Sequence, residues 1–172
     1  MKNLTFVYYQ FLFLNVKINI ILFLPIEIIR MKLNIFNRNH QQKNQSHVKN
    51  LIEVALSDGS IDDEEMMLLL NLATRLGISK EEIYQIKMNP GNVKFNPPKS
   101  SKERFNQIYD LVCMMMIDGQ VNKNELKLCK ELALRLGYLP LIVDDFILMI
   151  TKNISEGVSS RDTFNKAIKL YR

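Results

Sequence analysis

Apolar residues recur with a helical period through most of the chain after residue 47, and polar or helix-breaking runs separate these segments. Phe105, Ile108, Val112 and Met115, for example, fall on one face of a helix, and no segment alternates convincingly as a strand does. The pattern predicts an all-α protein with about seven helices, at residues 47–58, 62–76, 80–88, 101–118, 122–136, 140–152 and 160–171.

Part of this pattern occurs twice. Residues 58–65 (DGSIDDEE) and 118–125 (DGQVNKNE) share the motif D-G-x-(I/V)-(D/N)-x-x-E and lie 60 positions apart, and Arg-Leu-Gly at 75–77 recurs at 135–137. Each copy predicts a helix, a tight turn and a second helix. Because one such hairpin cannot bury its own apolar faces, we expect the two copies to pack as a pseudo-symmetric bundle.

The turn in each copy carries helix-capping residues. Asp62 with Glu65, and Asn122 with Glu125, have the spacing of a capping box, in which the side chains of the first and fourth residues bond to each other's backbone amides. The same spacing recurs at Ser79 with Glu82 and at Ser100 with Glu103. Four glycines, Gly59, Gly77, Gly119 and Gly137, stand where helices are expected to stop.

Asp58 and Asp118 need a further explanation, because a carboxylate in the last turn of a helix faces the negative end of its dipole. One explanation is an Asx turn, in which the carboxylate accepts backbone amides. The other is a cation held between Asp58 and Glu65, and between Asp118 and Glu125. An EF-hand is excluded, because Val54, Leu56, Met114 and Met116 occupy positions where that loop needs oxygen ligands.

Three segments are expected: an apolar stretch at 1–30, a polar linker at 31–46 and a helical domain at 47–172. His40 and His47 lie in the polar run 37–50 and are expected to be solvated. Cys113 and Cys129 lack zinc-site spacing and are expected to be buried thiols of a reducing compartment.

Charge is distributed unevenly. Residues 1–50 hold seven Lys or Arg and one acid, whereas residues 51–172 hold sixteen and seventeen. A neutral domain without a basic cluster argues against nucleic acid as a partner.

The apolar segment 4–24 is long enough to cross a membrane, but Lys17 lies near its middle and makes insertion marginal. The alternatives are a true start at Met31, a membrane anchor, a signal peptide or an extra core helix.

The duplicated motif, the L-A-x-R-L-G ending of both copies and the predicted helices together make residues 47–171 resemble the TerB-like family, which includes tellurite-resistance TerB and the N-terminal domain of the co-chaperone DjlA. The resemblance implies a cytoplasmic all-helical domain of two similar halves, linked to stress or tellurite resistance. It also implies a divalent-cation site, for calcium or magnesium, at Asp58, Asp62, Glu65, Asp118 and Glu125. Asn122, Lys123 and Asn124 make the second copy less acidic, so its site should be the weaker one.

Two functions remain after these arguments. The first is a non-enzymatic TerB-like domain that acts on an unidentified protein partner and holds a weakly bound divalent cation. The second is a metal-independent helical interaction module, tethered to the inner membrane if residues 4–24 form a span. An enzyme is not expected, because no catalytic triad, Cys-His pair or phosphate-binding glycine loop can be assembled from the sequence.

Overall fold

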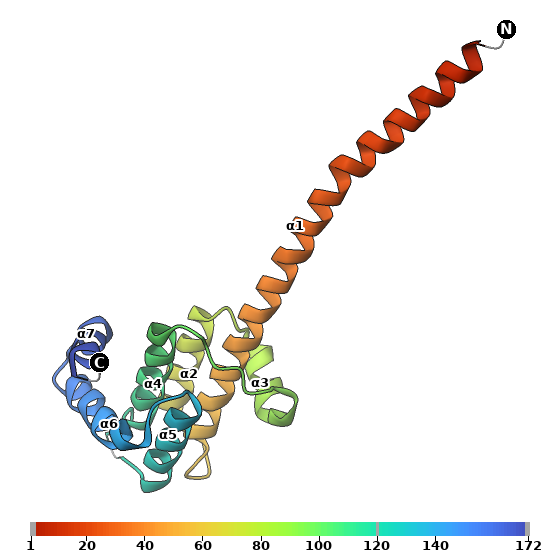
Figure 1. Cartoon of the computed structure of the whole chain (residues 1–172). Helices are drawn as coiled ribbons and strands as arrows, with labels where there is room; N and C mark the ends of the chain where they lie inside the picture. Colours follow the sequence, from red (N-terminus) through yellow and green to blue (C-terminus); the bar gives the residue numbers. More distant parts are fainter. Residues whose placement is uncertain (1–2, 120, 171–172) are drawn as a thin grey trace. The chain divides into compact units, whose positions relative to one another are not determined.

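The computed structural model describes the backbone of residues 3–119 and 121–170, and the side chains from residue 26 onward within those ranges. The all-α prediction is confirmed, since the described residues form seven α-helices and one short 3-10 helix and contain no strand (Figure 1). The elements are α1 (Asn3–Ala55), α2 (Asp63–Arg75), α3 (Lys80–Met88), η1 (Pro90–Asn92), α4 (Ser101–Met115), α5 (Lys123–Arg135), α6 (Pro140–Ser155) and α7 (Ser160–Leu170).

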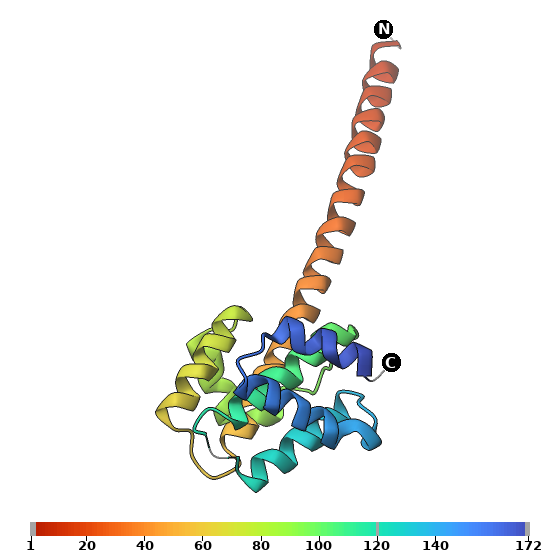
Figure 2. The ribbon, with the colours of Figure 1, turned by 90° about the vertical axis from the view of Figure 1, so that its left-hand side faces the viewer.

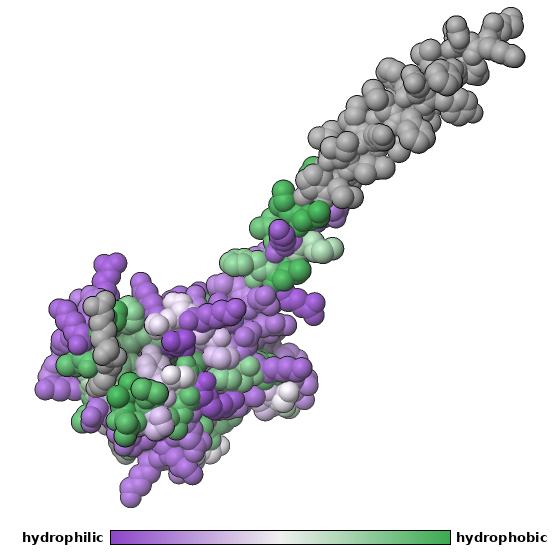
Figure 3. All heavy atoms as spheres, viewed as in Figure 1, coloured by the Kyte–Doolittle hydropathy of each residue, from purple (hydrophilic) through white to green (hydrophobic). Residues whose placement is uncertain are grey.

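The chain divides into two units, Met1–His40 and Gln41–Arg172, and α1 contributes to both. In the first unit α1 exposes large apolar side chains, which colour this stretch mostly green in Figure 3. They are Ile26, Ile28, Ile29, Met31, Leu33, Ile35 and Phe36. Among the residues described, no helix has the length and apolarity needed to cross a membrane. The predicted span at 4–24 concerns side chains outside the described residues.

Helix α4 organises the second unit. It packs against α2 on one side and against α5, α6 and α7 on the others, so helices from both copies of the repeat meet on it (Figures 1 and 2). The predicted core face is confirmed, because Phe105, Ile108, Val112 and Met115 are almost completely buried. The superposition of one hairpin on the other stays a prediction.

Aromatic rings join the C-terminal helices to α4. The ring of Phe105 lies 6.0 Å from that of Phe146 on α6 and 5.1 Å from that of Phe164 on α7, measured between ring centroids. Tyr138 stacks on Phe146 at 4.6 Å. Such contacts stabilise the packing beyond simple area burial.

Glycine ends α2 and α5 by the same backbone geometry. Gly77 and Gly137 have φ values of 71° and 92°, in the left-handed region that other residues avoid. The backbone amide after each glycine then donates to the carbonyl five residues earlier in the chain, from Ile78 to Ala73 at 2.9 Å and from Tyr138 to Ala133 at 3.1 Å. These are Schellman motifs, and they confirm the predicted ends.

Candidate functional site

The acidic turns of the two copies place their glutamates in equivalent positions. At the start of α2, Asp62 Oδ1 accepts from the Glu65 amide at 2.7 Å, and Glu65 Oε2 accepts from the Asp62 amide at 2.8 Å. At the start of α5, Glu125 Oε2 accepts from the Asn122 amide at 3.3 Å, while Asn122 Oδ1 accepts from the Asn124 amide at 2.9 Å. The reciprocal contacts of a capping box are present between Asp62 and Glu65 and also between Asn122 and Glu125, so both predicted boxes are confirmed.

Two further predicted caps differ from each other. Ser79 and Glu82 form a complete capping box at the start of α3. At the start of α4, Ser100 Oγ accepts from the Glu103 amide at 3.5 Å, but the carboxylate of Glu103 lies 3.5 Å from Lys43 Nζ on α1. The prediction of a complete capping box at Ser100 was wrong, because the Glu103 carboxylate lies against the Lys43 ammonium group of α1.

Glu65 and Glu125 are both 5% exposed, which is unusual for charged side chains. Burial is the main cause that raises the pKa of each carboxyl group, and the negative charges of Asp58 and Asp118 raise both further. The pKa of Glu125 rises to about 7. Each glutamate is influenced by negative charge from the other copy of the repeat, so the fold brings the two acidic turns within electrostatic range.

The aspartates of the predicted site have different surroundings. Asp58 and Asp118 are exposed, and Asp58 Oδ1 accepts from the Ser60 amide at 3.4 Å, the arrangement of an Asx turn. Asp62 is exposed and caps α2. The structure thus gives these three carboxylates surface positions around the two buried glutamates.

A coordination shell for a metal needs several oxygen ligands converging on one point. Among the described residues, no group of three or more acidic, histidine or cysteine side chains is arranged to hold a metal ion. The carboxylates therefore do not fit a preformed metal cage. A cation-binding role for Asp58, Asp62, Glu65, Asp118 and Glu125 stays a prediction.

A buried polar cluster connects α1, α2 and α4. His47 Nε2 lies 3.1 Å from Asp110 Oδ2, and Arg75 Nη2 donates to both carboxylate oxygens of Asp110 at 2.9 and 3.0 Å. His47 is 2% exposed and Asp110 is 8% exposed. The expectation of a solvated His47 was wrong, because the apolar face of α1 continues through it toward Val48 and Leu51.

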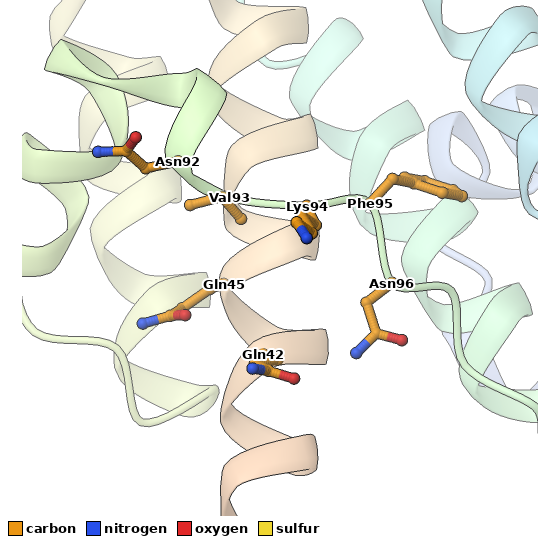
Figure 4. Close-up of a pocket in the computed structure, with 7 residues that line it drawn as sticks. All are labelled: Gln42, Gln45, Asn92, Val93, Lys94, Phe95 and Asn96. Carbon is orange, nitrogen blue, oxygen red and sulfur yellow. The ribbon is translucent and has the colours of Figure 1, made fainter.

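A cavity of about 450 Å³ lies beside α1 in the second unit (Figure 4). It is lined by Gln42, Gln45, Asn92, Val93, Lys94, Phe95 and Asn96. Asn96 extends toward the helix that carries Gln42, whereas the ring of Phe95 points away from it. The backbone amide of Asn96 donates to Ser46 Oγ at 2.9 Å, and Lys49 Nζ donates to the backbone carbonyl of Val93 at 3.3 Å. These bonds attach the connection between the two copies to α1.

A family of known proteins matches the part of the chain that contains the first helical hairpin. The family model described as tellurite resistance protein TerB matches residues 26–88, which include α2, α3 and the first acidic turn. Residues 26–88 are therefore TerB-like. Neither the curated proteins nor the solved structures yielded a significant match. The TerB match contains Asp58, Asp62 and Glu65, and the second acidic turn lies beyond it.

Proposed function

We propose that this TerB-like protein is a non-enzymatic component of a tellurite or stress response and acts by binding another protein. The observation that carries the proposal is the TerB match over residues 26–88. The hydrogen bonds of the acidic turns support it, because Asp62 and Glu65 are already bonded to backbone amides and stabilise the start of a helix. A helix whose first turn is fixed by such bonds can hold its exposed side chains in a constant position for a protein partner.

The surroundings of the cysteines argue against thiol chemistry. Burial raises the pKa of Cys113 to about 12 and that of Cys129 to about 12. A nucleophilic cysteine needs a lowered pKa, so that the thiolate forms near neutral pH. The negative charge of Asp110 raises the pKa of Cys113 further, which makes the buried polar cluster unsuitable for activating it.

Helix α6 offers a surface for the partner. Leu141 is 92% exposed and Leu148 is 67% exposed, and their spacing of seven residues places them on the same face of the helix. Leu139, at the start of α6, is 66% exposed. Exposed apolar residues grouped on one helix face are typical of protein contact surfaces.

The test of this function is a growth assay in the native host. A strain lacking the gene is complemented with the wild-type protein, with Leu141→Ser/Leu148→Ser, or with the control Met88→Ser, which changes another exposed apolar residue on α3. We expect the double variant to lose tellurite resistance and the control to keep it. Equal tellurite sensitivity of the deletion and wild-type strains would refute the proposed response, and full resistance of the double variant would refute the α6 surface.

A second function, binding of a divalent cation at the acidic turns, is favoured by one observation. Glu65 and Glu125 carry raised pKa values because they are buried among like charges, and a cation would relieve that repulsion. Glu65 and Glu125 would face the bound cation from the buried side, and Asp58 and Asp118 would lie on its solvent side. A proton on Glu125 relieves the same repulsion, so cation and proton should compete.

Thermal unfolding at pH 6 and pH 8 with millimolar calcium or magnesium distinguishes these cases. Cation binding predicts a rise in Tm that is larger at pH 8, where Glu125 is ionised, and that is absent in Glu65→Gln/Glu125→Gln. A Tm that ignores both cations at both pH values would leave the acids as helix caps only.

A further inference from the structure

A second cavity, of about 380 Å³, lies between α6 and α7 near the C-terminal ends of both helices. These are the two blue helices of Figure 1. The cavity is lined by Met149, Lys152 and Asn153 from α6, by Glu156 directly after that helix, and by Lys166, Lys169 and Leu170 from α7. It therefore combines an apolar wall with a concentration of positive charge.

Positive charge exceeds negative charge around this cavity. Three lysines line it, and Glu156 is the one acid among the described lining residues. Glu156 Oε1 lies 3.8 Å from Lys152 Nζ, in an exposed pair that stabilises weakly. No described carboxylate lies within ion-pair distance of Lys166 or Lys169. The positive charges of these two lysines are thus not neutralised by a described carboxylate.

The decisive feature is the buried amide of Asn153, which is 4% exposed. Lys166 Nζ donates to Asn153 Oδ1 at 2.9 Å, and this bond fixes which side of the amide carries the oxygen. Asn153 Nδ2 then has no hydrogen-bond partner among the described residues. A buried amide donor without a partner is costly and uncommon in folded proteins.

Helix stabilisation explains only part of this arrangement. Lys152 and Lys169 lie in the last turns of α6 and α7, where cations interact favourably with the helix dipole. The Asn153 carbonyl accepts from the Val158 amide at 2.8 Å, so the end of α6 is already closed by the backbone. Neither effect accounts for the buried, unpartnered amide donor of Asn153, a residue that lines this lysine-rich cavity.

We propose that the α6/α7 cavity binds a small carboxylate that carries an apolar body. One carboxylate oxygen accepts from Asn153 Nδ2, and the other accepts from the ammonium groups of Lys166 and Lys169. The apolar body packs against Met149 and Leu170. The volume is within the range of small-molecule sites, which combine a mostly apolar wall with a few fixed polar groups. The proposal does not depend on the acidic turns or on tellurite resistance.

The test is a titration with sodium hexanoate followed by two-dimensional amide NMR at constant ionic strength. We expect saturable shifts of the Asn153 side-chain NH₂ signals and of backbone amides in α6 and α7. Acetate lacks the apolar body and hexanol lacks the charge, so each should bind at least about tenfold more weakly. Shifts of equal size with acetate, or with hexanol, would refute the proposed combination of charge and apolar contact.

Variants provide a second measure. Lys169→Met and Lys166→Met should each raise the hexanoate Kd by at least about tenfold, because each removes a charge-assisted hydrogen bond. Lys127→Met, which changes an exposed lysine on α5, is the matched control and should bind hexanoate as the wild type does. Lys169 is exposed, so its replacement leaves the fold intact. An unchanged Kd in folded Lys169→Met and Lys166→Met would overturn the site.

The source of the carboxylate is distinguished by N-acetyl-alanyl-leucine, which presents the end of a peptide chain. Tighter binding of this dipeptide than of hexanoate assigns the site to a chain terminus. Tighter binding of hexanoate assigns it to a free apolar acid. Absence of saturable binding with both compounds would refute the proposal.

Discussion

His47 Nε2 on α1 lies 3.1 Å from Asp110 Oδ2 on α4, and both side chains are buried. Arg75 from α2 bonds to the same carboxylate, so one aspartate joins three helices that are far apart in the sequence.

Replacement of Asp110 should therefore destabilise the protein strongly. Asp110→Ala leaves His47 and Arg75 without their partner, and we expect a loss of about 2–4 kcal/mol in the free energy of unfolding. Chemical denaturation measures this loss. Asp144→Ala is the control, because Asp144 pairs with Lys130 at the surface and should contribute less than about 1 kcal/mol. Equal losses in the two variants would contradict the structural role of Asp110.

The glycines that end helices should resist substitution. Gly77→Ala and Gly137→Ala force a Cβ into the left-handed region, at a cost of about 1–2 kcal/mol each. No atom within 4 Å would clash with either new Cβ, so the loss measures backbone strain alone. Gly91→Ala is the matched control, because Gly91 has neither a positive φ nor a close neighbour. Thermal unfolding should separate the first two variants from the third.

Stability should decrease with pH because of Glu125. Its pKa is about 7 in the folded protein, against an ordinary value of 4.5, so the folded state holds a proton that the unfolded state has lost. The contribution is complete below about pH 4.5 and disappears as pH rises to about 7, and it amounts to at most about 3 kcal/mol. Glu125→Gln should flatten this part of the stability curve, as measured by denaturation at several pH values. An unchanged slope in the variant would assign the effect to other groups.

The cysteines should be unreactive in the folded protein. Burial raises the pKa of both thiols to about 12, so almost no thiolate is present at pH 8. We expect slow reaction of Cys113 and Cys129 with a disulfide reagent under native conditions and rapid reaction of both after unfolding in guanidinium. Rapid modification of a folded sample would show that local opening exposes them.

The sequence predicted those parts of the structure that depend on local chemistry. Capping boxes at Asp62, Ser79 and Asn122 need only residues three positions apart, and helical spacing was enough to find the buried face of α4. Contacts between distant residues could not be read in this way. His47 stands in a polar run, and its partner Asp110 lies 63 positions later, so nothing near His47 indicated its burial. Glu103 pairs with Lys43, 60 positions away, instead of completing a local box.

The acidic turns illustrate the same limit at the candidate site. The motif contains all five carboxylates of the predicted cation site, but their burial could not be inferred from spacing alone. Glu65 and Glu125, in the first turns of α2 and α5, are buried, while Asp58 and Asp118 are exposed. The fold, and not the motif, makes the two glutamates different from the aspartates.

The segment that joins the two copies is attached to helices of both copies. Ser46 and Lys49 bond to it from α1, and the guanidinium of Arg135 lies 4.1 Å from the centre of the Phe95 ring. A protease that severed the backbone at Pro97 would therefore release neither half, and the nicked protein should still migrate as one particle until denaturant is added.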